Sequence, residues 1–196
     1  MRIIPNEDTE SQEKVSNPQD TTDENTISKD EGMRISPLEQ TIADLLVKQV
    51  AHERFNASLY ITMSNFYNVK GYMKLGTYYE MRAEEEIQHS KWIEEYLFDS
   101  DIIFNFPQID KVEIKLVELI DSFQLTVDKE NDTTKAINNI AAEAIKINDF
   151  QTFEFLQRLI KEQVEEMSIS RTILTIANSN SDWLIKEKAI LSFYSK

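Results

Sequence analysis

Four stretches of the sequence place cation-binding side chains within otherwise apolar helical stripes. They supply Glu53, Glu86 with His89, Glu130, and Gln163 with Glu166. Residues three or four positions apart share one face of a helix, so these side chains are expected to point inward. A buried carboxylate without a partner is costly, and several together repel each other unless a cation neutralises them. Carboxylates with one imidazole suit iron or manganese, so the pattern predicts a metal site.

The spacing of these residues predicts that they meet. Glu53 and Glu86 are 33 residues apart, and so are Glu130 and Gln163. If each pair belongs to a helical hairpin that turns midway, its two members lie at similar height, near the middle of a bundle. Two ions bridged by Glu86 would neutralise the carboxylates. Tyr60, two turns after Glu53, would be a core aromatic by itself and here becomes a neighbour of the metals.

The elements that position these residues are long helices. Apolar periodicity predicts them from Leu38 to about Tyr67, Tyr72 to about Phe98, about Val112 to Ile145, and about Phe150 to Ala177. A short last helix, in "SDWLIKEKAILSFY", begins after Ser181 or Asp182 as N-cap. The first two and the last two long helices have short links, whereas "DSDIIFNFPQID" is long enough to run the length of a bundle. The expected fold is an all-α four-helix bundle with one long crossover and a short fifth helix.

Composition excludes several classes of function. The 196 residues carry a formal charge of -14, so nucleic acid and anionic membranes are poor partners and cations should be attracted. There is no cysteine, which excludes disulfides and thiolate sites and fits a cytoplasmic location. No apolar run approaches the length of a membrane helix, and the first residues, "MRIIPNEDTE", lack the apolar centre of a secretory signal.

The N-terminal segment differs from the rest of the chain. Residues 1–36 are polar and acidic, so we expect a disordered tail, followed by one domain over residues 37–196. Met33 begins "MRISPLEQ", directly before the first periodic segment. The first 32 residues are therefore either a genuine tail or a segment that precedes the true start.

At the candidate ligands the chain resembles the non-haem ferritins of bacteria, over roughly Leu38 to Leu191. "AHERFNASLYITMSNFY" resembles the family's first helix and "RAEEEIQHSKWIEEYL" its Glu-x-x-His second helix. Lys129-Glu130 falls where the third helix supplies its glutamate, and "KEQVEEM" is similar to the fourth-helix "EQxEE" motif. The resemblance implies a ferritin-like di-iron domain.

The resemblance also implies a role for each residue. Glu53, Glu86 and His89 would hold the first iron. Glu86, Glu130 and the Gln163/Glu166 end of the fourth helix would hold the second, with Tyr60 beside the centre. The matching positions of a third iron site are Glu85, Glu162, Glu165 and Glu166, which by themselves could equally be solvated acidic residues. Ile87 stands where a bacterioferritin has its haem-binding methionine, so no haem is expected.

The implied function is iron storage. The enzyme would be a ferroxidase that oxidises Fe(II) with O2 or H2O2 at two irons per subunit, in a homo-oligomeric cage of 24 subunits. Rival interpretations are a structural bundle without chemistry, a di-metal oxygenase and an encapsulated ferritin-like cargo protein. Intact ligands on four helices argue against a structural bundle without chemistry. The absence of a second Glu-x-x-His motif argues against the oxygenase, and the full length of the helices argues against the cargo protein.

Overall fold

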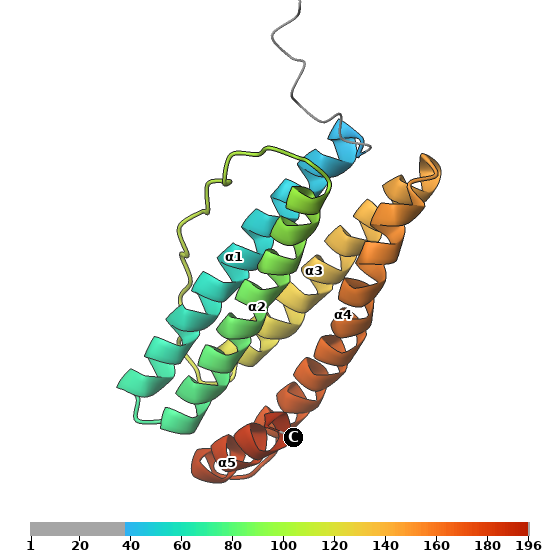
Figure 1. Ribbon diagram of the computed structural model, residues 1–196. Helices are drawn as coiled ribbons and strands as arrows, with labels where there is room; N and C mark the ends of the chain where they lie inside the picture. Colours follow the sequence, from blue (N-terminus) through green and yellow to red (C-terminus); the bar gives the residue numbers. More distant parts are fainter. Residues whose placement is uncertain (1–37, 196) are drawn as a thin grey trace, which may run out of the picture. The chain divides into compact units, whose positions relative to one another are not determined.

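The computed structural model describes residues 38–195, which contain five helices (Figure 1). They are α1 (Gln40–Val69), α2 (Met73–Asp99), α3 (Asp121–Lys146), α4 (Phe150–Ala177) and α5 (Trp183–Tyr194). The first four have 26 to 30 residues and are therefore about 40 to 45 Å long. The predicted all-α four-helix bundle with a short fifth helix is confirmed. The segment predicted to be a disordered tail, residues 1–36, lies outside the described residues.

Two antiparallel hairpins build the bundle. α1 and α2 form one hairpin and α3 and α4 the other, each closed by a link of three residues (Figure 1). Gly71 lies in the first link at φ +86°, and Asn148 lies in the second at φ +61°. Glycine adopts this left-handed conformation without a steric penalty, and asparagine tolerates it better than most residues. The short links that the sequence predicts are thus local turns with suitable residues.

The crossover between the hairpins is longer than the sequence analysis expects. The prediction that a helix begins at about Val112 is wrong, because α3 begins at Asp121 and residues 102–117 run as an extended segment beside the bundle (Figure 1). Val112, Ile114 and Leu116 are half-buried against the core, and the charged residues between them are exposed. Apolar side chains with a period of two suit an extended chain, which lays all of them on one side.

The apolar core consists of two clusters at different heights of the bundle. One contains Leu46, Val50, Ile93, Leu97, Ile137, Ile140, Leu156 and Leu159. The other contains Leu59, Tyr60, Met63, Tyr67, Tyr78, Tyr79, Phe123, Ile173 and Ile190. On every long helix, the candidate ligands lie between a residue of the first cluster and a residue of the second. The bundle therefore positions a polar layer between two apolar ones.

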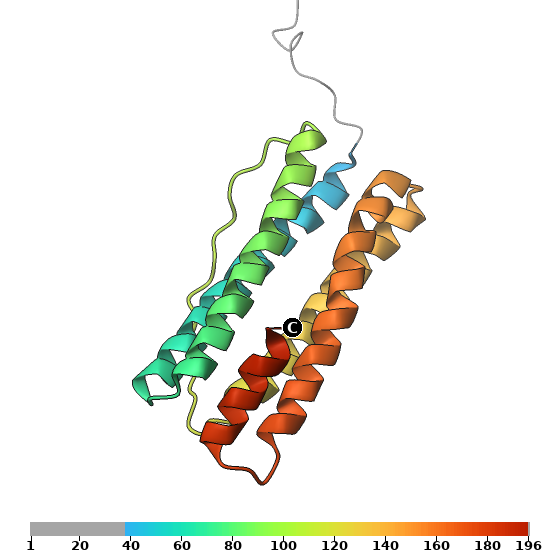
Figure 2. The same cartoon turned by 60° about the horizontal axis from the view of Figure 1, so that its bottom comes forward.

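The fifth helix contacts both α2 and α4 near the end of the bundle where α4 ends (Figure 2). The Asp182 side chain accepts a hydrogen bond from the backbone N–H of Leu184 at 2.8 Å, so Asp182 is the N-cap. At the buried side of α5, the Lys186 ammonium donates to the carbonyl of Ala177 at 2.7 Å. No helix among residues 38–195 combines the length and the apolar character needed to cross a bilayer.

Candidate metal centre

The polar layer brings together the residues that the spacing predicts to meet. Glu53 from α1, Glu86 and His89 from α2, Glu130 from α3, and Gln163 and Glu166 from α4 are all buried. Two groups of three residues form, and in each group one ligand atom from every residue lies within 4.8 Å of the other two: Glu53, Glu86 and His89 in one, Glu86, Glu130 and Glu166 in the other. Glu86 belongs to both groups and links them.

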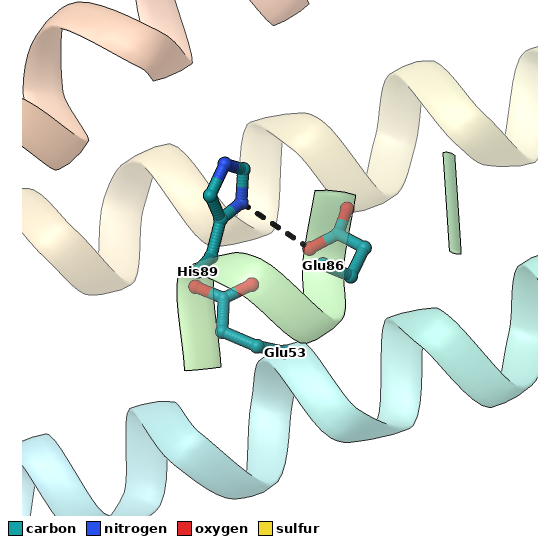
Figure 3. Close-up of side chains that lie close together, drawn as sticks. All are labelled: Glu53, Glu86 and His89. Atoms are coloured by element: carbon teal, nitrogen blue, oxygen red, sulfur yellow. Dashed lines mark ion pairs between the residues drawn. The ribbon is translucent and has the colours of Figure 1, made fainter. Parts of the chain in front are cut away.

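The first group combines two carboxylates with an imidazole (Figure 3). His89 Nδ1 lies 3.8 Å from Glu86 Oε2, one helical turn along α2. The Gln49 side-chain amide, one turn before Glu53 on α1, donates to Glu53 Oε1 at 2.7 Å. This bond fixes the orientation of the Glu53 carboxyl while Glu53 Oε2 stays buried without a hydrogen-bond partner. An unpartnered buried oxygen beside an imidazole is an arrangement that a metal ion would complete.

In the second group, Glu130 is held by hydrogen bonds from neighbouring helices. The Tyr60 hydroxyl donates to Glu130 Oε1 at 2.6 Å. The Gln163 amide donates to Glu130 Oε2 at 2.7 Å and to the Glu130 carbonyl at 3.2 Å. Gln163 and Tyr60 therefore hold the Glu130 carboxylate in position, and they contact the centre through it. Glu166 lies close to the imidazole of the first group, with its Oε1 3.5 Å from His89 Nε2. Its Oε2 has no hydrogen-bond partner.

The side chain of Arg82, for which the sequence predicts no role, extends into the second group. Arg82 lies on α2 one turn before Glu86, and its side chain is 1% exposed. Its Nη2 forms an ion pair with Glu130 Oε1 and lies 3.9 Å from Glu86 Oε1 and 3.5 Å from Glu166 Oε2. One guanidinium nitrogen thus contacts all three carboxylates of the group.

Burial and charge shift the pKa values of the carboxyls in opposite directions. Burial, reinforced by the charge of Glu86, raises the pKa of Glu53 well above its ordinary value. Burial also raises the pKa of Glu166, and the lowering influence of Arg82 does not compensate for it. Burial alone would raise the pKa of Glu86, but its neighbours His89 and Glu53 and the charge of Arg82 together lower it. Because ligand carboxyls must be ionised, binding of a cation at Glu53 and Glu166 works against these upward pKa shifts.

Three of the four residues predicted for a third iron site lie outside the two groups, whereas the fourth, Glu166, belongs to the second group. Glu85 is 45% exposed, Glu162 is half-buried and Glu165 is exposed. Together with Arg82, His89 and Glu166 they line a cavity of about 190 Å³ between α2, α4 and α5. Within residues 38–195, neither group of clustered ligand atoms includes Glu85, Glu162 or Glu165. The cavity joins the solvent-facing acidic side chains to the buried centre.

Sequence reasoning missed three residues in or next to the centre. Gln49 orients Glu53, Arg82 contacts the second group, and the hydroxyl of Tyr194 in α5 donates to Glu85. Gln49 and Arg82 occupy inward positions of the same helical stripes as the ligands, and that position is the signal that identifies them. Tyr194 is close to α2 only because α5 folds back, which helical periodicity does not reveal.

Comparisons with known proteins agree with this fold. A family model described as a ferritin-like domain matches residues 43–178. The chain is 30% identical over 137 residues to the bacterial non-heme ferritin of Campylobacter jejuni, with 70% of this chain and 82% of that protein covered. It is also 30% identical over 162 residues to the bacterial non-heme ferritin of Staphylococcus saprophyticus, with 80% and 97% covered.

Solved structures give the same picture of the fold. The Chlorobium tepidum ferritin superposes with a TM-score of 0.70 at 25% identity, with 81% of this chain and 95% of that chain covered. An open pore ferritin from Archaeoglobus fulgidus superposes with a TM-score of 0.74 at 20% identity, with 79% and 96% covered.

Proposed function

The chain belongs to the ferritin-like domain family, and we propose that it stores iron. In this proposal it oxidises Fe(II) with O2 or H2O2 at the paired carboxylate centre and keeps the Fe(III) as a mineral inside a multisubunit cage. The observation that carries the proposal is the pair of ligand groups that share Glu86 in the middle of the bundle. A structural bundle would have no reason to bury four glutamates at one height, because each buried carboxyl is costly.

The donor set suits iron as a substrate. Carboxylate oxygens and a single imidazole are ligands that Fe(II) accepts, and none of the described ligand-type residues is a sulfur donor. Anionic oxygen ligands bind Fe(III) more strongly than Fe(II), because the more highly charged ion gains more from them. Oxidation is thus favoured by the residues themselves. His89, Glu53 and Glu86 would hold the first iron, and Glu86, Glu130 and Glu166 the second, with Gln163 and Tyr60 positioning Glu130.

The cavity between α2, α4 and α5 offers a path for iron. Glu85, Glu162 and Glu165 line it on the solvent side, and Glu166 lies at its buried end. We assign these four residues to a third, outer iron site that passes ions to or from the centre. Acidic side chains around a narrow opening raise the local concentration of cations.

We also propose that the subunits assemble into a homo-oligomer of 24 copies in the cytoplasm. Large apolar side chains remain exposed on the isolated subunit: Phe98, Phe106, Phe150, Val164, Leu184 and Ile185. Exposed apolar side chains on several elements are typical of a subunit that is covered by partners. The C-terminal α5 and the family resemblance favour the closed cage over a dimer.

Two measurements on purified protein test this function. Size-exclusion chromatography with light scattering should give a mass many times the 22.9 kDa of the chain. Stopped-flow mixing of two Fe(II) per subunit with O2 should give a fast oxidation phase that Glu86→Ala abolishes, because that change removes the carboxylate shared by both groups. Glu165→Ala is the matched control and should keep the fast phase. A Glu86→Ala protein that oxidises iron at the wild-type rate would rule out the paired centre.

A second candidate function is a non-storage di-metal carboxylate oxidase or a subunit without catalytic activity. The observation that favours it is the buried Arg82 within the second ligand group. An assembled cage that takes up no iron mineral, even with a working fast phase, would favour the non-storage oxidase. A cage without the fast phase would favour the inactive subunit.

A further inference from the structure

The guanidinium of Arg82 lies where a second metal ion would have to bind. Its Nη2 is within 4.0 Å of Glu86 Oε1, Glu130 Oε1 and Glu166 Oε2 at once. These are the three residues whose carboxylate oxygens form the second ligand group. A metal ion bound by them needs bonds of about 2.0 to 2.2 Å to the same side chains, so ion and guanidinium compete for one space.

The surroundings of Arg82 hold it in this place. The side chain is 1% exposed, and its guanidinium carbon lies 5.4 Å from the centre of the Tyr60 ring. Tyr60 itself donates to Glu130, the carboxylate that Arg82 pairs with. A buried guanidinium is always charged, so it needs the carboxylates as much as they need a cation. In the metal-free protein Arg82 therefore supplies the positive charge that the second group lacks.

The other terminal nitrogen of the guanidinium has a partner toward which the side chain could withdraw. Arg82 Nη1 lies 3.3 Å from Glu85 Oε2, and both residues line the 190 Å³ cavity. Glu85 is partly exposed and also accepts a hydrogen bond from the Tyr194 hydroxyl. A movement of Arg82 toward Glu85 would keep one ion pair while clearing the space between Glu86, Glu130 and Glu166.

We propose that Arg82 is an internal cation that takes the place of the second metal ion and makes the two halves of the centre unequal. The inference rests on the proposed function, because it concerns the same metal centre. The first ion binds at Glu53, Glu86 and His89 without displacing Arg82. The second ion binds only when Arg82 withdraws toward Glu85. Arg82 is thus a positioning residue that sets the order and the affinity of metal binding.

Anaerobic titration with Co(II), a redox-inert probe with a visible spectrum, tests this order. Wild-type assemblies should bind one Co(II) per subunit tightly, and the second about 100-fold or more weakly, because the guanidinium must first leave its ion pairs with Glu130 and Glu166. Arg82→Met, which keeps much of the volume but removes the charge, should bind two Co(II) with affinities within about tenfold of each other. Arg54→Gln is the matched control, since Arg54 pairs with Glu94 outside the centre at 2.8 Å, and it should behave like the wild type.

A second readout is independent of binding curves. Saturating Co(II) should raise the melting temperature of Arg82→Met more than that of the wild type, because each tight site adds its own stabilisation. Arg82→Gln serves if the methionine variant does not assemble. Two equally tight ions in the wild type, or a single ion in both Arg82 variants, would overturn the inference and leave the metal centre standing. If no protein binds Co(II), the centre itself is absent and the proposed function fails.

Discussion

Replacing Glu53 with glutamine should stabilise the metal-free protein at neutral pH. Burial raises the pKa of Glu53 well above its ordinary value, so this carboxyl is harder to ionise in the folded protein than in the unfolded chain. Glutamine has nearly the same shape, can still accept the hydrogen bond from Gln49, and carries no titratable proton. The variant therefore resembles the protonated form of the wild type at every pH.

The sign and size of this difference in stability follow from the linkage between proton binding and folding. A carboxyl with a raised pKa contributes its full stability below its ordinary pKa and loses that contribution as the pH rises through the shifted value. Relative to Glu53→Gln, the wild type should lose about 1.4 kcal/mol of unfolding free energy for each pH unit between these two values. Glu166, whose pKa is also raised, is present in both proteins, but its charge contributes to the upward pKa shift of Glu53, so the difference reports the two interacting carboxyls together.

Urea unfolding measures this difference between pH 4.5 and 7.5. The protein is first freed of metal with a chelator, and unfolding is followed by the circular dichroism signal of the helices at one fixed subunit concentration. The two proteins should coincide at the acidic end and diverge as the pH rises, with the variant the more stable. Excess Co(II) should reverse the order, because only the wild type keeps its first site. Glu154→Gln, at an exposed position of α4, controls for the loss of a charge. Parallel pH profiles for the wild type and Glu53→Gln would refute the reasoning.

Three further changes test other parts of the structure. Tyr60→Phe removes the hydroxyl that donates to Glu130, and unfolding of the metal-free protein should become easier by about 1 to 2 kcal/mol in denaturant melts. Gly71→Ala should cost about 1 kcal/mol by the same assay, because no atom obstructs the new methyl group but φ is +86°. Deletion of residues 1–32 should leave the assembly mass and the fast oxidation phase unchanged, since this segment lacks apolar periodicity; loss of assembly would assign it a structural role.

The helices themselves follow closely from the sequence. The predicted fourth helix has the observed bounds Phe150–Ala177, and the predicted first and second helices differ from α1 and α2 by one or two residues at each end. Their apolar stripes have the helical period, and Asp149 caps α4 by accepting from the Thr152 N–H. Local signals of this kind need no knowledge of the partner helices.

The crossover shows where local reasoning misses the structure. Val112, Ile114 and Leu116 are followed by the apolar residues of α3, so a helical stripe can be drawn through Leu116 and Phe123. The period of two over residues 112–116 competes with that interpretation, and packing against the bundle decides in favour of the extended form. A short extended segment gains its stability only from the surface that it covers, which the sequence does not reveal.

Arg82 could have been identified from the same sequence pattern as Glu86. Both residues occupy inward positions of one helix, and a charge directed at the core requires a partner whatever its sign. Counting only the acidic members of the stripe gives a cluster that must bind two ions to be neutral. Including Arg82 leaves a second group that one built-in cation already contacts, while among the described residues Arg82 forms no ion pair with Glu53 or His89 of the first group. Taken with both signs of charge, the residues of the stripe therefore support the proposal that the first ion binds freely and that the second must displace a side chain.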